Sequence, residues 1–176
     1  GVMLSHHNVG SNIRAVDQVF HITGSDVLIG ILPFFHSFGY TGGLWLTLTL
    51  DPKAVFHFNP LDARTIGKLC EKHGVTIAMA TPTFLRGFLK RCTPEQMKML
   101  DLVIVGAEKL PPELGDAFLE KFNVAPTEGY GTTELSPVAA FNVPPNRAGE
   151  TDQVTTKVGT VGRVMPGAAA KVIDTD

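Results

Sequence analysis

The chain has 176 residues, which is enough for one domain with a substantial hydrophobic core. Hydrophobic residues make up 44% of the sequence, which excludes a disordered chain, and the formal net charge of -2 provides no broad basic surface for nucleic acid. The two cysteines lack any paired spacing, and no apolar run is as long as a transmembrane helix. The composition therefore predicts a globular cytoplasmic protein with reduced thiols and no nucleic-acid partner.

The two ends of the sequence suggest a longer parent protein. The chain begins at Gly1 without a methionine and enters a helical pattern almost at once, and residues 173–176 resemble the middle of a strand or a turn. We therefore expect a segment excised from a longer polypeptide.

Helical and strand patterns alternate through the first half of the chain. Ser5 and Asp62 can each cap a helix, Gly74 stands where a helix-ending glycine belongs, and Pro33 ends a strand. In chain order we predict a helix, a buried strand, a helix that is apolar almost all round, a short strand and another helix: residues 5–20, 27–32, 39–50, 54–58 and 62–73.

The second half continues this alternation. We predict a strand and a helix at residues 75–80 and 81–90, and a short helix that begins at residues 93–95. A strand, a helix and a last short strand follow at residues 102–105, 111–122 and 124–128. Strands rich in β-branched residues that alternate with helices predict an α/β fold, with a mostly parallel sheet flanked by helices.

The C-terminal part of the sequence has a different pattern. A mobile surface loop is predicted for residues 142–156, which are rich in Pro, Gly and Thr. Two short strands that begin a small β unit are predicted for residues 157–174.

Chemically informative segments follow three of the predicted strands. These segments are residues 33–36, 106–108 and 129–134. Parallel sheets bind ligands beyond the carboxyl ends of their strands, so we expect the three segments to converge.

The last of these segments contains groups suited to a nucleotide. Tyr130 offers a flat apolar face to a heterocycle, Thr132 and Thr133 can donate hydrogen bonds to a phosphate, and Glu134 is a hard oxygen ligand for Mg²⁺. Gly129 and Gly131 would allow positive φ and a close approach to the ligand. The alternative is a turn that leaves a buried strand, with Glu134 capping the next element.

Five segments in order resemble the adenylate-forming superfamily of acyl-CoA synthetases, luciferases and peptide-synthetase adenylation domains. They are residues 1–8, 32–39, 106–110, 129–134 and 158–167. The resemblance implies a fragment of that family's large N-terminal domain. Residues 1–25 would then be the last helix of a preceding subdomain, residues 26–141 the nucleotide- and acyl-binding subdomain, and residues 142–176 a loop and the start of a β subdomain.

The resemblance also implies an activity. Such an enzyme activates a fatty acid with ATP and Mg²⁺ to form an acyl-adenylate, and a thiol then displaces AMP. Residues 32–39, 105–110 and 141–144 most resemble the acyl-[acyl-carrier-protein] synthetase module of bifunctional 2-acylglycerophosphoethanolamine acyltransferases. That branch implies acyl carrier protein as the thiol partner and a lysophospholipid as the final acceptor, through an acyltransferase module outside this chain. It would place the parent protein at the inner face of a bacterial membrane.

Roles for single residues follow from the same resemblance. Tyr130 would stack on adenine, Thr133 would donate to the α-phosphate beside Thr132, Glu134 would hold Mg²⁺, and His36 would border the acyl carboxylate. Gly106, Ala107 and Glu108 would line the other side of the adenine through their backbone, and Gly129 and Gly131 would complete the nucleotide contacts. Each role has a plainer alternative: a core ring tethered by its hydroxyl for Tyr130, a solvated carboxylate or helix cap for Glu134, and a packed histidine for His36.

Other groups that the family uses lie outside this sequence. They are the phosphate loop upstream, an aspartate for the ribose, and a mobile C-terminal domain with its lysine. We therefore predict that the chain alone is inactive. Three other interpretations stay open: a coenzyme A ligase for fatty or aryl acids, a nucleotide-binding module without chemistry, and a structural α/β domain whose glycines only form turns.

Overall fold

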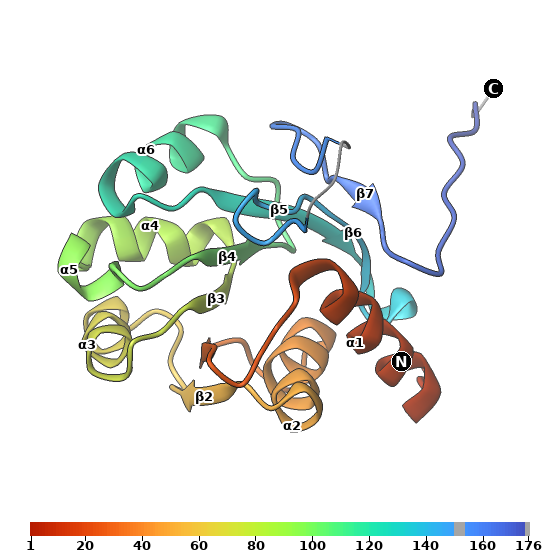
Figure 1. Cartoon of the computed structure of the whole chain (residues 1–176), viewed down its shortest axis with the longest axis horizontal. Helices are drawn as coiled ribbons and strands as arrows, with labels where there is room; N and C mark the ends of the chain where they lie inside the picture. The colour runs from red at the N-terminus through yellow and green to blue at the C-terminus, as the bar shows by residue number, and fades with distance from the viewer. Residues whose placement is uncertain (150–153, 175–176) are drawn as a thin grey trace.

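A seven-stranded sheet forms the centre of the molecule in the computed structural model, which describes residues 1–149 and 154–174. The strand order is β2-β1-β3-β4-β5-β6-β7 (Figure 1). The strands are β1 (Val27–Gly30), β2 (Lys53–Phe56), β3 (Ile77–Ala80), β4 (Leu102–Val105), β5 (Pro126–Gly131), β6 (Val138–Phe141) and β7 (Arg163–Val164). Strands β1 to β5 are parallel, whereas β6 and β7 join antiparallel. The predicted α/β fold with a mostly parallel sheet is confirmed.

Helices cover both faces of this sheet (Figure 1). They are α1 (His6–Phe20), the π-helix η1 (Gly39–Trp45), α2 (Leu46–Leu50), α3 (Ala63–His73), α4 (Pro82–Arg91), α5 (Pro94–Met97), α6 (Pro112–Phe122) and the 3-10 turn η2 (Thr133–Leu135). The predicted caps are in place. Ser5 accepts a hydrogen bond from the Asn8 amide, Asp62 accepts one from the Thr65 amide, and Gly74 has a left-handed φ of 63°.

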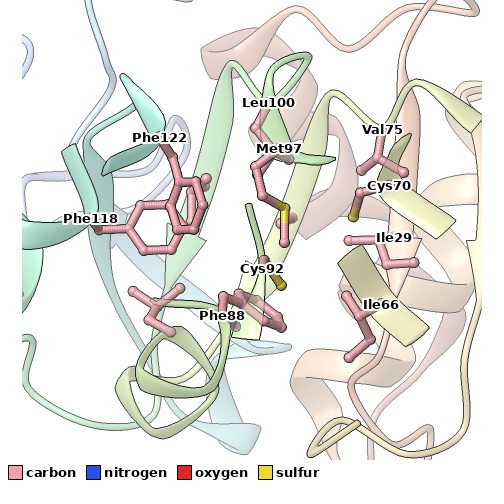
Figure 2. Packing of buried hydrophobic residues seen from close by; sticks show 14 of the residues in the cluster. Ile29, Ile66, Cys70, Val75, Phe88, Cys92, Met97, Leu100, Phe118 and Phe122 are labelled. Carbon is pink, nitrogen blue, oxygen red and sulfur yellow. The ribbon is translucent and has the colours of Figure 1, made fainter. Parts of the chain in front are cut away.

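The side chains of the central strands alternate between two hydrophobic cores, as the pleat of a strand requires. Ile77 and Met79 pack with residues of α1 and α2, whereas Ala78 and Ala80 face the side covered by α3, α4, α5 and α6. Figure 2 shows this second core, in which helix and strand residues interdigitate: Ile29, Ile66, Cys70, Val75, Phe88, Cys92, Met97, Leu100, Phe118 and Phe122. Burial raises the pKa of the Cys70 thiol to about 12, so this thiol stays protonated.

Three elements differ from the sequence-based expectation. The segment expected as an all-buried helix is η1 followed by α2, and it is exposed along one side, with Leu48 67% exposed. Strand β5 begins at Pro126 and continues through the glycine–tyrosine stretch, which was expected to follow it. Strand β6 was not predicted, and it makes the sheet change direction beside β5.

The C-terminal part of the chain contains fewer strands than expected. The described part of residues 157–174 contains β7 and no second strand, so that expectation was wrong. Strand β7 pairs with β6 and thereby joins the main sheet. The expected mobile loop includes residues 150–153, which lie outside the described residues. Its described beginning is tied to β5 through Asn142, and to Asp26, the residue before β1, through Arg147. The division into subdomains remains an interpretation.

Strand β2 lies at the outer edge of the sheet. Among the described strands it pairs with β1 alone. Phe56, Phe58 and Leu61 are exposed on or just after it, with Phe58 94% exposed. No described helix is long and apolar enough to cross a membrane.

Candidate functional site: a cavity at the carboxyl ends of the strands

A cavity of about 240 Å³ opens where β1, β4 and β5 end. Its walls come from the segments after β1 and β4, from β5 and the turn that follows it, and from β6. The lining residues are His36, Ser37, Phe38, Ile104, Val105, Gly106, Ala107, Gly129, Tyr130, Gly131, Thr132, Thr133, Pro137, Val138 and Phe141. The predicted convergence of the three segments is therefore present in the structure.

Most of the predicted site residues line this cavity, and two acidic residues do not. The eight that line it are His36, Gly106, Ala107, Gly129, Tyr130, Gly131, Thr132 and Thr133. Neither Glu108, whose backbone was expected to border the base, nor Glu134 is among the residues that line it. Glu108 instead accepts a long hydrogen bond of 3.3 Å from the Thr83 hydroxyl.

Tyr130 is half exposed at the cavity wall. Its exposed fraction is 50%, and its backbone pairs with Ala140 of β6. This exposure argues against a buried core ring. The ring is large, apolar and accessible, which is what stacking on a heterocycle requires.

The positive φ expected at Gly129 and Gly131 is absent, and the close packing of two strands requires these glycines instead. Positive φ occurs among the described glycines at Gly74, Gly159, Gly162 and Gly167, and neither cavity glycine is among them. A Cβ at Gly129 would overlap the Phe141 ring, and a Cβ at Gly131 would overlap the Pro137 carbonyl. These two glycines therefore let β6 approach β5 closely, and they leave Tyr130 as the side chain that faces outward between them.

Hydroxyl groups connect the segment after β1 to the segment after β5. The Ser37 and Thr133 hydroxyl oxygens are 3.2 Å apart, and the Thr41 hydroxyl donates to the Ser136 carbonyl at 3.1 Å. Ser37 was not among the predicted site residues, although it lies in the motif that was recognised. The two connections fix the Thr133 hydroxyl at the cavity wall.

His36 is exposed, so it is not a packed core histidine. Its Nδ1 accepts a hydrogen bond of 3.2 Å from the Phe38 amide, which requires an unprotonated Nδ1. The aromatic residues that follow β1 divide between two environments. Phe38 lines the cavity, whereas Phe35 is 94% exposed.

Glu134 lies on the exposed turn η2, directly after the cavity residues Thr132 and Thr133. Among the described residues, no group of three or more His, Cys, Asp or Glu side chains could hold a metal ion. Mg²⁺ is commonly bound by one or two carboxylates together with substrate phosphates. The exposed carboxylate of Glu134 fits that kind of site, in which a nucleotide would supply the other ligands.

The profile of the family described as AMP-binding enzyme matches residues 1–176. The chain belongs to this family. The match covers the segments that form the cavity. AMP binding agrees with a cavity whose wall contains an exposed tyrosine ring and hydroxyl groups.

Individual relatives agree with this assignment. The acyl-CoA ligase sidI of Aspergillus fumigatus is 33% identical over 98% of this chain and 29% of its own length. The 4-coumarate–CoA ligase-like 9 protein of Oryza sativa subsp. japonica is 31% identical over 100% of this chain and 32% of its own length. The chain therefore spans about a third of the length of these relatives.

Solved structures show the same fold. Apo MatB from Rhodopseudomonas palustris superimposes with a TM-score of 0.85 at 30% identity, over 99% of this chain and 33% of that chain. ATP-bound MatB from the same organism gives a TM-score of 0.80 at 30% identity, over 95% of this chain and 31% of that chain. The narrower resemblance to an acyl-carrier-protein synthetase module is not decided by these similarities.

Proposed function

We propose that this chain forms the nucleotide-binding part of an ATP-dependent acid–thiol ligase. The full enzyme would join a carboxylic acid to AMP and then transfer the acyl group to a thiol. The observation that carries this proposal is the cavity at the carboxyl ends of β1, β4 and β5, with the half-exposed ring of Tyr130 and the fixed hydroxyl of Thr133 in its wall.

Each group in the cavity can perform one part of nucleotide binding. The Tyr130 ring stacks on adenine, and the backbone of Gly106 and Ala107 borders the base from the next strand. Thr132 and Thr133 donate hydrogen bonds to the α-phosphate. These bonds stabilise the charge that develops on the phosphate oxygens as the acid carboxylate attacks phosphorus. His36 borders the carboxylate, and Phe38 contributes apolar surface for the acyl group.

The positive charge that balances the polyphosphate has to come from groups other than the residues that line the cavity. None of the described residues that line the cavity is a lysine or an arginine. Mg²⁺ held by Glu134 and the phosphates would neutralise part of the polyphosphate charge.

We therefore expect the 176-residue chain alone to bind ATP weakly and to release no pyrophosphate above background. Pyrophosphate release at the rate of a complete ligase would contradict this expectation.

Two thiol acceptors are in competition. The relatives named as CoA ligases favour coenzyme A, with a fatty or aryl acid as substrate. The resemblance of residues 32–39, 105–110 and 141–144 favours acyl carrier protein and a fatty acid, with onward transfer to a lysophospholipid. Incubating the full-length protein with ATP and a radiolabelled fatty acid, and with either thiol in turn, distinguishes the two by which thioester forms.

The nucleotide site is tested by titration of AMP and ATP into the full-length protein. Replacing Tyr130 with Ala removes the stacking surface, so we expect the dissociation constants to rise by about 5- to 150-fold. Tyr130→Phe keeps the ring and should bind within about twofold of the wild type. Tyr40→Ala is a matched control, because Tyr40 is also partly exposed but does not line the cavity. Unchanged nucleotide affinity in folded Tyr130→Ala protein would refute the proposal.

A further inference from the structure

Glu128 lies next to the nucleotide cavity, and the proposed function gives it no role. It lies two residues before Tyr130 on β5, and its backbone pairs with Val105, the last residue of β4. The chain leaves β4 at this point and forms segment 106–110, which borders the cavity through Gly106 and Ala107. Glu128 is thus beside the start of a segment that touches the ligand site, although it does not line the cavity itself.

The Glu128 carboxylate holds the far end of that segment. Its Oε1 accepts a hydrogen bond of 2.9 Å from the Leu110 amide, and this contact is partly buried. Hydrogen bonds between a backbone amide and a carboxylate are about twice as strong as those between neutral groups. A second hydrogen bond between the segment and a side chain, from the Thr83 hydroxyl to Glu108, is exposed and long at 3.3 Å. Of these two hydrogen bonds, the one to Glu128 is therefore the stronger tether.

Glu128 is itself fixed in place by the neighbouring strand. Its carbonyl accepts from the Asn142 amide at 3.0 Å and from the Asn142 side chain at 3.3 Å. Asn142 is 3% exposed, so this anchor is buried. The Glu128 carboxylate thus projects from a rigid strand and fixes a segment that lacks regular secondary structure.

The tethered segment has a backbone conformation that needs such support. Ala107 has φ of 68°, in the left-handed region that is unfavourable for a residue with a Cβ atom. Such conformations persist where the surroundings determine them, and they are common at ligand sites. If the segment relaxed, the backbone of Gly106 and Ala107 would leave the cavity wall, and the ligand would have to restore it on binding.

We infer that Glu128 is a positioning residue, which holds segment 106–110 in the shape that borders the nucleotide base. The inference rests on the proposed function and adds a residue that acts through Leu110 rather than by touching the nucleotide. Backbone groups can distinguish one base edge from another, whereas stacking on Tyr130 tolerates any base. Glu128 therefore contributes to the preference for adenine, and Tyr130 contributes to affinity for every purine nucleotide.

The experiment compares Glu128→Leu with Glu128→Gln in the full-length protein, by titration with AMP and GMP. The amide oxygen of glutamine can still accept from Leu110, whereas leucine cannot. We expect Glu128→Leu to weaken AMP binding about tenfold and to reduce the preference for AMP over GMP, and Glu128→Gln to stay within about twofold. Glu113→Leu, on the exposed first turn of α6, is the matched control. Equal losses in Glu128→Gln and Glu128→Leu, or no loss in either, would overturn the inference.

Hydrogen exchange in the wild-type protein gives a test that does not depend on how the variants fold. The tether predicts that the Leu110 amide exchanges slowly even without nucleotide, and rapid exchange would overturn the inference.

The variant Tyr130→Ala distinguishes a failure of this inference from a failure of the proposed function. If Tyr130→Ala loses nucleotide and Glu128→Leu does not, the positioning role fails and the proposed function stands. If nucleotide affinity survives Tyr130→Ala, the proposed function fails.

Discussion

The two ends of the parallel strands differ in how their polar groups are satisfied. At the carboxyl ends, the side chains of His36, Tyr130 and Thr133 face a cavity. At the amino ends, Asp26 precedes β1 and Asp101 precedes β4, and Arg147 bridges both carboxylates.

Several hydrogen bonds connect Arg147, Asp26 and Asp101 at the amino ends of the strands. Arg147 makes two hydrogen bonds to Asp26, of 3.1 and 2.6 Å, and its Nε donates to Asp101 at 3.1 Å. Asp26 also accepts from the Thr76 hydroxyl at 2.9 Å and from the Thr23 amide at 2.9 Å. The Asp26 side chain is only 6% exposed, so its charge depends on these partners. Polar groups at this end stabilise one another, whereas those at the other end remain available to a ligand.

The largest expected effect comes from removing Arg147. Arg147→Ala leaves the Asp26 charge buried and unpaired, so we expect a loss of about 3–5 kcal/mol in the free energy of unfolding. Urea unfolding of the chain measures it. Arg64→Ala, at an exposed position on α3, is the control and should change stability by no more than about 0.5 kcal/mol. An equally small change in Arg147→Ala would show that the amino ends do not stabilise the fold as described.

The next largest effect is expected at Gly131, because at the carboxyl ends of the strands close backbone packing contributes to stability where ion pairs do not. Gly131→Ala would place a methyl group against the Pro137 carbonyl, and we expect about 1–3 kcal/mol of destabilisation from this overlap. Gly10→Ala, inside α1 with open space around it, should instead stabilise by about 0.5–1 kcal/mol. Thermal unfolding of both variants gives the sign. A neutral Gly131→Ala would mean that β6 can move away from β5 at no cost.

The pH dependence of stability sharpens the comparison further. Burial alone would raise the pKa of Asp26, but hydrogen bonds from Arg147, Thr23 and Thr76 outweigh burial and hold the pKa below the ordinary value of 3.8. The stabilisation is therefore complete above pH 3.8 and is lost as the pH falls toward the lower folded value. We expect a slope of up to about 1.4 kcal/mol per pH unit from this group, measured by urea unfolding. Asp26→Asn should flatten the slope, and an unchanged slope would contradict the assignment.

The smallest effect is expected at the hydroxyl pair. Ser37→Ala removes the partner of the Thr133 hydroxyl, so nucleotide affinity of the full-length protein should fall by about threefold, or roughly 0.5–1 kcal/mol. Ser25→Ala removes a comparable hydroxyl contact, to Thr23, at the amino ends of the strands. We expect no change in nucleotide affinity from Ser25→Ala. A similar loss in both variants would show that the two ends are not functionally distinct.

Local chemistry made much of the fold predictable. The caps at Ser5 and Asp62 and the helix end at Gly74 depend on residues within one turn, so the sequence pattern located α1 and α3 closely. The central strands are short, apolar and bounded by turn residues. By contrast, β6 is a brief run after Pro137 whose strand character comes from pairing with β5, and that pairing is not visible in a local pattern.

The location of the candidate site was predictable from the sequence, whereas the exact set of residues that line it was not. The rule that ligands bind at the carboxyl ends of parallel strands located the cavity, because all three segments follow predicted strands. It did not show how far each segment follows the cavity wall, so a backbone contact was expected from Glu108, which does not line the cavity, and none was expected from Ser37, which does. The Arg147 bridge was missed for another reason. Asp26 and Asp101 come together only because β1, β3 and β4 are neighbours in the sheet.

The outer strand β2 has a consequence for the behaviour of the molecule in solution. One side of this strand has no described neighbour, and the aromatic rings of Phe56 and Phe58 are exposed beside it. Free backbone donors and acceptors next to apolar rings are a template on which a second polypeptide can add a strand. At high concentration we therefore expect copies of this chain to associate edge to edge through β2, unless another polypeptide segment covers it.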